Sequence, residues 1–139
     1  VSYIDVAGAG GTSWSQVEKF RSNEPAKKEA AEAFTDWGIP TADCILDVRE
    51  KVNNKPIIAS GGIRTGLDAA KAIALGAEMA GLARSVLKVA TESSERLIEV
   101  METRELELKM AMFGIGVDSM KGLQKTDRIY RTDGSTGSL

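Results

Sequence analysis

The fold is decided by the stretch Pro56-Ile57-Ile58-Ala59-Ser60-Gly61-Gly62-Ile63-Arg64-Thr65-Gly66. Its first five residues form an apolar run bounded by turn residues, which is typical of a strand buried on both faces of a parallel sheet. The glycines that follow let backbone N–H groups approach a ligand closely. Thr65 and Asp68 match a capping box for a helix over residues 67–75, which Gly76 ends. A glycine turn, a helix N-terminus and Arg64 together predict an anion site that suits a phosphate. The alternative is a tight turn that binds nothing.

The same alternation of elements recurs on both sides of this stretch. Residues 1–6 predict a β-branched strand, and residues 78–83 predict a weaker one. Helices are expected over residues 15–34 with a break at residues 22–25, over residues 42–52 with Thr41 as the cap, and over residues 93–113 with Gly114 as the stop. Cys44 is expected to be a buried residue of the helix over residues 42–52. Strands that alternate with helices predict parallel β/α units.

Three strands cannot close a barrel. A (β/α)8 barrel typically needs roughly 250 residues, and this chain has 139. The chain is therefore either a small open sheet or the end of a larger barrel. It begins with Val1 inside a strand, which predicts that its start is not a natural N-terminus. Residues 131–139 are expected to form a frayed tail.

Composition excludes several classes of function. With 18 basic and 20 acidic residues the net charge is −2, so no nucleic-acid partner is expected. The absence of histidine excludes histidine catalysis and histidine metal ligands from this segment. The single Cys44 excludes an internal disulfide. No secretory signal and no apolar run near ~18 residues is present, so we expect a cytoplasmic protein without a membrane span.

Two further loops should lie at the same edge of the sheet as the glycine turn at residues 61–66. The turn at residues 81–84 follows the third strand, and phosphate sites in (β/α)8 barrels are frequently built from the loops after the last two strands. The loop at residues 8–14 follows the first strand, and Thr12 or Ser13 could bond a ligand there. Trp14 is expected to pack beneath this loop, and Asp5 is expected to be a hydrogen-bonded structural carboxylate.

Three motifs carry a resemblance to a known family: residues 5–14 (DVAGAGGTSW), residues 34–41 (FTDWGIPT) and residues 58–77, which contain the glycine turn. They resemble type 2 isopentenyl diphosphate isomerase, an FMN-dependent (β/α)8 TIM barrel. The glycine turn is shared with FMN-dependent hydroxyacid oxidases, glutamate synthases and inosine monophosphate dehydrogenases. The other two motifs are much more specific to the isomerase.

The resemblance implies a place in the barrel and a set of binding residues. Residues 1–123 would be the C-terminal portion of an FMN-binding TIM barrel, with strands six to eight and their helices, and residues 124–139 would be a tail. Thr12 would contact FMN. The FMN phosphate would be bound in the strand-seven and strand-eight loops by Gly62, Ile63, Arg64, Ala83 and Arg84.

The resemblance also implies a reaction. The family interconverts isopentenyl and dimethylallyl diphosphate, with reduced FMN mediating proton transfer, NADPH supplying the reduction and Mg²⁺ binding the substrate diphosphate. The family's substrate-binding and catalytic side chains lie outside this sequence, so no catalytic residue is expected here and the isolated segment is expected to be inactive. A homo-oligomer is expected as well.

Two alternatives remain open. One is another FMN-dependent barrel oxidoreductase, which a histidine base in the remainder of the protein would favour. The other is a noncatalytic phosphate-binding half-barrel module that dimerises to cover its exposed strand edges.

Overall fold

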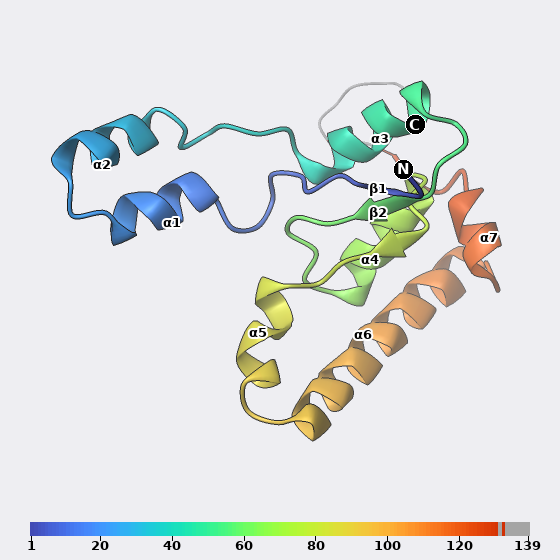
Figure 1. Ribbon diagram of the computed structural model, residues 1–139. Coiled ribbons are helices and arrows are strands. Elements are labelled where there is room, and N and C mark those ends of the chain that lie inside the picture. The colour runs from blue at the N-terminus through green and yellow to red at the C-terminus, as the bar shows by residue number, and fades with distance from the viewer. Residues whose placement is uncertain (131, 133–139) are drawn as a thin grey trace.

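The computed structural model describes residues 1–130 and residue 132 (Figure 1). Predictions for the tail at residues 131–139 therefore fall almost wholly outside the described residues. Along the described chain the elements are β1 (Ile4–Asp5), α1 (Trp14–Arg21), α2 (Pro25–Glu32), α3 (Thr41–Lys51), β2 (Ile57–Ala59), α4 (Gly66–Ala74), β3 (Met79–Ala80), α5 (Arg84–Ala90), α6 (Ser94–Ile115) and α7 (Met120–Gln124).

The strands form one parallel sheet in the order β1-β2-β3. Ile4 pairs with Ile57, and Ile58 pairs with Met79. The predicted α/β class with parallel strands is confirmed. The central strand is the buried one, since Ile57 and Ala59 are both 0% exposed. Because all three strands are parallel, their carboxyl ends and the loops that follow lie at one edge of the sheet.

Two apolar clusters hold the helices to the sheet. One joins β2 to α3 and α4 and includes the fully buried Ile45 and Ile57; the other joins α4 to α6 and α7 around Leu123. Burying each of these three side chains contributes about 1.5–3 kcal/mol. Helix α4 takes part in both clusters, and its alanines allow close packing on both sides. It is therefore the helix that connects the sheet to the C-terminal part of the chain.

The start of α4 has the predicted capping box. The Thr65 hydroxyl oxygen accepts from the Asp68 amide at 3.0 Å, and the Asp68 carboxylate accepts from the amides of Thr65 (3.0 Å) and Arg64 (3.1 Å). Partial burial raises the pKa of Asp68. The bonds from Thr65 and from these amides, together with the Lys71 charge, outweigh the burial and hold the pKa below its ordinary value. Glu107 on α6 accepts from the next amide, that of Gly66, at 2.6 Å.

Three local predictions were wrong in detail, and one helix was missed. Thr41 begins α3 without capping it, because its hydroxyl bonds elsewhere. Cys44 is only partly buried, and its thiol donates to the Ile39 carbonyl. Helix α6 runs past Gly114 to Ile115, and its C-cap Gly116 takes the left-handed conformation (φ +75°) that favours glycine. Helix α5 was not expected.

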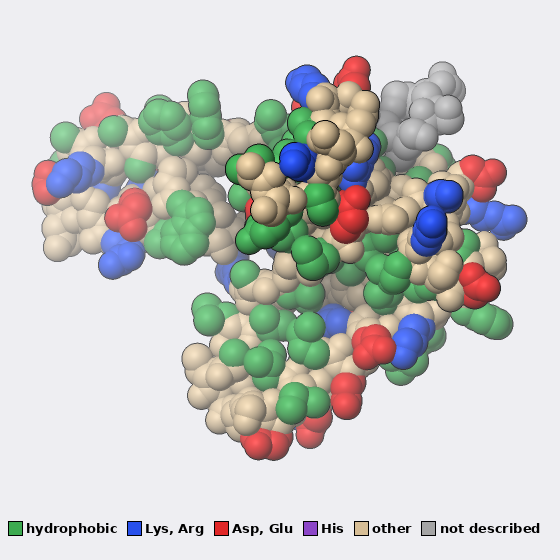
Figure 2. Space-filling model, turned by 45° about the vertical axis from the view of Figure 1, so that its right-hand side comes forward, with side chains coloured by type: hydrophobic (Ala, Val, Ile, Leu, Met, Phe, Trp, Pro, Cys, Tyr) green, Lys and Arg blue, Asp and Glu red, His purple; other side chains and the backbone are tan. Residues whose placement is uncertain are grey.

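Helices α1 and α2 project from the sheet and pack on each other (Figure 1). Neither helix contains a buried residue. Phe20 is 79% exposed and Trp37, just beyond α2, is 78% exposed. Figure 2 shows hydrophobic side chains on the surface of this projection. In the described part of the chain, no helix is both long and apolar enough to cross a membrane.

The cap of α4 predicts a pH dependence of stability. Because the pKa of Asp68 is lowered in the folded state, its stabilisation is fully present above the unfolded value of about 3.9 and is lost as pH falls through the folded value. We expect Asp68→Asn to cost about 0.5–2 kcal/mol near neutral pH and to converge with the wild type in acid. Urea midpoints measured from neutral to acidic pH test this. A constant difference at all pH values would contradict it.

Close packing of α4 on α6 predicts the effect of a single methyl group. A Cβ at Gly66 would overlap the Arg104 carbonyl oxygen and lie 2.6 Å from the Leu108 nitrogen. We therefore expect Gly66→Ala to lower the free energy of unfolding by about 1–3 kcal/mol. Gly114→Ala is the matched control, because it has the same gain in helix propensity with no atom within 4 Å of the new Cβ. Equal stability of the two variants would contradict the prediction.

Candidate functional site

Two glycine loops meet in backbone contact at the carboxyl ends of β1 and β2. A Cβ at Gly61 would overlap the Gly8 carbonyl oxygen, and a Cβ at Gly62 would overlap that of Gly10. Gly61 and Gly62 also have positive φ values of 100° and 81°. Only glycine meets both requirements, so these loops pack without side chains between them.

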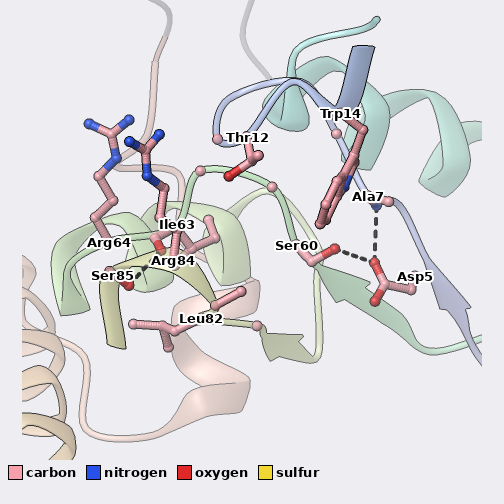
Figure 3. A pocket seen from close by; sticks show the side chains of 16 residues that line it. Asp5, Ala7, Thr12, Trp14, Ser60, Ile63, Arg64, Leu82, Arg84 and Ser85 are labelled. Carbon is pink, nitrogen blue, oxygen red and sulfur yellow. Dashed lines mark hydrogen bonds between the residues drawn. The ribbon is translucent and has the colours of Figure 1, made fainter. Parts of the chain in front are cut away.

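A third loop, residues 81–83, follows β3 and, with the first turn of α5, completes a cavity. The Gly81 amide donates to the Ala59 carbonyl at 2.8 Å, and the Ser85 hydroxyl donates to the Ile63 carbonyl at 3.4 Å. The cavity between the three loops has a volume of about 830 Å³. All six residues expected to bind a cofactor line it: Thr12, Gly62, Ile63, Arg64, Ala83 and Arg84 (Figure 3). The six residues thus lie on one continuous surface, and their binding of a cofactor stays a prediction.

The backbone offers this cavity unpaired donors. Among the described residues, the amides of Gly62, Ile63, Ala83 and Arg84 have no hydrogen-bond acceptor. Backbone N–H groups of this kind prefer a partner, and phosphate oxygens are good acceptors. Figure 3 shows the side chains of Arg64 and Arg84 extending in the same direction, which adds positive charge to that end of the cavity.

The α4 N-terminus itself does not supply these donors. The amides of Arg64, Thr65 and Gly66 are occupied by the carboxylates of Asp68 and Glu107. The expectation that this helix end would add its partial positive charge to an anion site needs correction. Two carboxylates offset that charge, so the free amides of the glycine turn and the two arginines are what remain for a ligand.

Asp5 has the structural role that was expected. Its Oδ1 accepts from the Ala7 amide at 3.0 Å and from the Ser60 hydroxyl. These bonds hold Ala7 at a positive φ of 42°, unusual for a residue with a side chain. Asp5 also faces the cavity, away from the arginines (Figure 3).

The expectation for Trp14 was wrong. Its side chain is 72% exposed and lines the cavity instead of packing beneath the loop. Helix α1 begins at Trp14 and projects away from the sheet (Figure 1).

Sequence reasoning missed one residue between the loops. The Thr41 hydroxyl donates to the Gly61 carbonyl at 2.6 Å. Residues 39–40, just before Thr41, also lie beside the first loop. The Ala9 amide donates to the Ile39 carbonyl at 2.8 Å, and Ala9 forms an isolated parallel β-bridge with Pro40. Thr41 and Gly61 are far apart in sequence, so no local pattern signals their contact.

The residues present fit the phosphate group of FMN. One cavity is lined by Arg64 and by four residues whose amides have no acceptor in the described chain, and the cavity-lining Asp5 is already hydrogen-bonded. They do not fit a metal ion. Among the described residues, no group of three or more His, Cys, Asp or Glu side chains could hold one.

Comparison with known proteins agrees with this geometry. Residues 34–130 match the family model described as FMN-dependent dehydrogenase. Isopentenyl-diphosphate delta-isomerase of Oceanobacillus iheyensis is 58% identical over 129 residues, which are 93% of this chain and 37% of that protein. The isomerase of Methanothermobacter thermautotrophicus is 48% identical over 137 residues, or 99% of this chain and 38% of that protein.

This chain thus spans less than two fifths of the length of the isomerases that it matches. The family match extends over most of the chain and includes the glycine turn, the third loop and the helices behind them. The chain therefore belongs to the FMN-dependent dehydrogenase family and is similar to isopentenyl-diphosphate delta-isomerases.

Proposed function

We propose that this chain is the part of a type 2, FMN-dependent isopentenyl-diphosphate isomerase that binds the FMN phosphate. The complete enzyme would interconvert isopentenyl diphosphate and dimethylallyl diphosphate in isoprenoid biosynthesis. The observation that carries the proposal is the cavity in which four unpaired amides and two arginines converge. The names of the relatives supply the reaction.

Within that enzyme, β1, β2 and β3 would be strands six, seven and eight of a (β/α)8 barrel, and residues 1–123 would be its C-terminal part. Two observations support this placement. The strands are parallel and in sequence order, as consecutive barrel strands are. The relatives are also more than twice as long as this chain, which leaves length for the other strands.

The roles of the chain's own groups follow from the cavity. The amides of Gly62, Ile63, Ala83 and Arg84 would donate to phosphate oxygens, and the two guanidinium groups would balance the phosphate charge. The Thr12 hydroxyl would bond another part of the cofactor. Bound reduced FMN would supply the proton transfer that shifts the substrate's double bond. The chain's contribution is thus to hold and orient the cofactor, with NADPH as the source of reduction.

The proposal includes a homo-oligomeric, cytoplasmic enzyme without a nucleic-acid or membrane partner. A second candidate is an FMN-dependent oxidoreductase, which the match to the FMN-dependent dehydrogenase family favours. The isomerase is preferred because its curated members are up to 58% identical to this chain.

Removing one arginine should weaken phosphate binding selectively. We expect Arg64→Ala to lower the affinity for FMN by about tenfold or more, because a charge-assisted bond is lost. The affinity for riboflavin, which has no phosphate, should change little. Quenching of flavin fluorescence on titration of the apoprotein measures both.

The control is Arg96→Ala. Arg96 is an exposed arginine of α6 that pairs only with Glu99 among the described residues, and its loss should leave both affinities unchanged. An equal loss of FMN and riboflavin affinity in Arg64→Ala would contradict a phosphate contact.

Because this chain is proposed to supply only part of the cofactor site, we expect activity in the complete protein and none in this segment alone. With FMN, NADPH and Mg²⁺, the complete protein should convert isopentenyl diphosphate to dimethylallyl diphosphate, and residues 1–139 alone should not. Product analysis after incubation checks both. Turnover by the isolated segment would contradict this assignment, and oxidation of a hydroxyacid by the complete protein would favour the oxidoreductase.

A further inference from the structure

Thr41 lies where the two glycine loops meet. A Cβ at Gly8 would lie 2.5 Å from the Thr41 hydroxyl oxygen, and a Cβ at Gly10 would lie 3.4 Å from it. On its other side the same hydroxyl donates to the Gly61 carbonyl at 2.6 Å. Thr41 thus occupies the space left open by glycines of the first loop and bonds to the second loop.

The bond to Gly61 fixes the orientation of one peptide group. The described chain has no cis peptide bond, and in a trans peptide the C=O and N–H groups point in opposite directions. With the Gly61 carbonyl directed at Thr41, the Gly62 N–H must point to the opposite side. Gly62 lines the cavity, and its amide has no acceptor among the described residues.

The position of Gly11 keeps this amide accessible. A Cβ on Gly11 would lie 2.9 Å from the Gly62 nitrogen, so any side chain there would cover the N–H group. The glycine at this position leaves the donor open toward the cavity.

The Gly61–Gly62 peptide needs such a restraint. Both flanking residues are glycines with positive φ, and glycine moves between backbone conformations at little steric cost. A reversed peptide would present the Gly61 carbonyl to a bound phosphate, and the two oxygens would repel each other. The Thr41 hydroxyl opposes that reversal.

We infer that Thr41 is a positioning residue for phosphate binding, because its hydroxyl holds the Gly61–Gly62 peptide with the Gly62 N–H directed into the cavity. This inference rests on the proposed function, since the phosphate is that of FMN. It assigns a role to Thr41, the last residue of the motif at residues 34–41, which neither lines the cavity nor caps its helix.

The test compares FMN with riboflavin in the complete apoprotein. Thr41→Val keeps the shape of the side chain and removes the hydroxyl, and it should lower the FMN affinity by about tenfold with little change for riboflavin. Thr41→Ser restores the hydroxyl and should recover the wild-type ratio of the two affinities. Thr41→Ala takes the place of the valine variant if the latter does not fold, because alanine has no γ-methyl group to lie against the Gly61 oxygen.

Thr103→Val is the matched control. Its hydroxyl bonds the Glu99 carbonyl on the exposed side of α6, so both affinities should stay at the wild-type values. A purely structural role for Thr41 predicts equal losses for FMN and riboflavin, or none for either, and each of these results would overturn the inference. A wild-type protein that fails to bind FMN would instead overturn the proposed function itself, and the inference with it.

Discussion

The structure depends on the direct backbone contact between two glycine loops. Gly61 and Gly62 lie against the carbonyls of Gly8 and Gly10 with no room for a Cβ. This contact brings the end of β1 to the end of β2, and with residues 81–85 it defines the cavity. A side chain at these glycines would separate the loops and move the amides that face the cavity. Glycine is therefore required here by packing as well as by its conformational freedom.

The polar groups around the cavity fall into two sets with different partners. The amides of residues 64–66 are satisfied by Asp68 and Glu107, and this network fastens α4 to α6. The amides of Gly62 and Ile63, immediately before them, are left without a partner in the described chain. The two sets meet at Arg64. Its amide is bonded to Asp68 and belongs to the first set, whereas its side chain lines the cavity.

Local patterns in the sequence were sufficient for the elements whose interactions are local. The buried strand over residues 56–60 and the capping box of Thr65 and Asp68 involve neighbours in the chain, and both were predicted. The six residues that the family resemblance named as cofactor-binding line one cavity, because parallel strands bring the loops that follow them to one edge. Thr41 and Trp14 were misjudged, since the partner of one is distant in sequence and the exposure of the other depends on the direction in which α1 leaves the sheet.

The distinction between local and long-range interactions also explains how a phosphate-binding site can be separate from the residues that carry out an enzyme's chemistry. Every donor of the cradle is backbone or arginine from two neighbouring loops, so its geometry needs only adjacent strands and the contacts between them. In the proposed enzyme the substrate would be held by side chains outside this sequence, which itself contains no histidine. In a barrel those side chains come from the ends of several different strands. Under the proposed function, phosphate binding would depend on the loops of this chain, whereas catalysis would depend on the complete barrel.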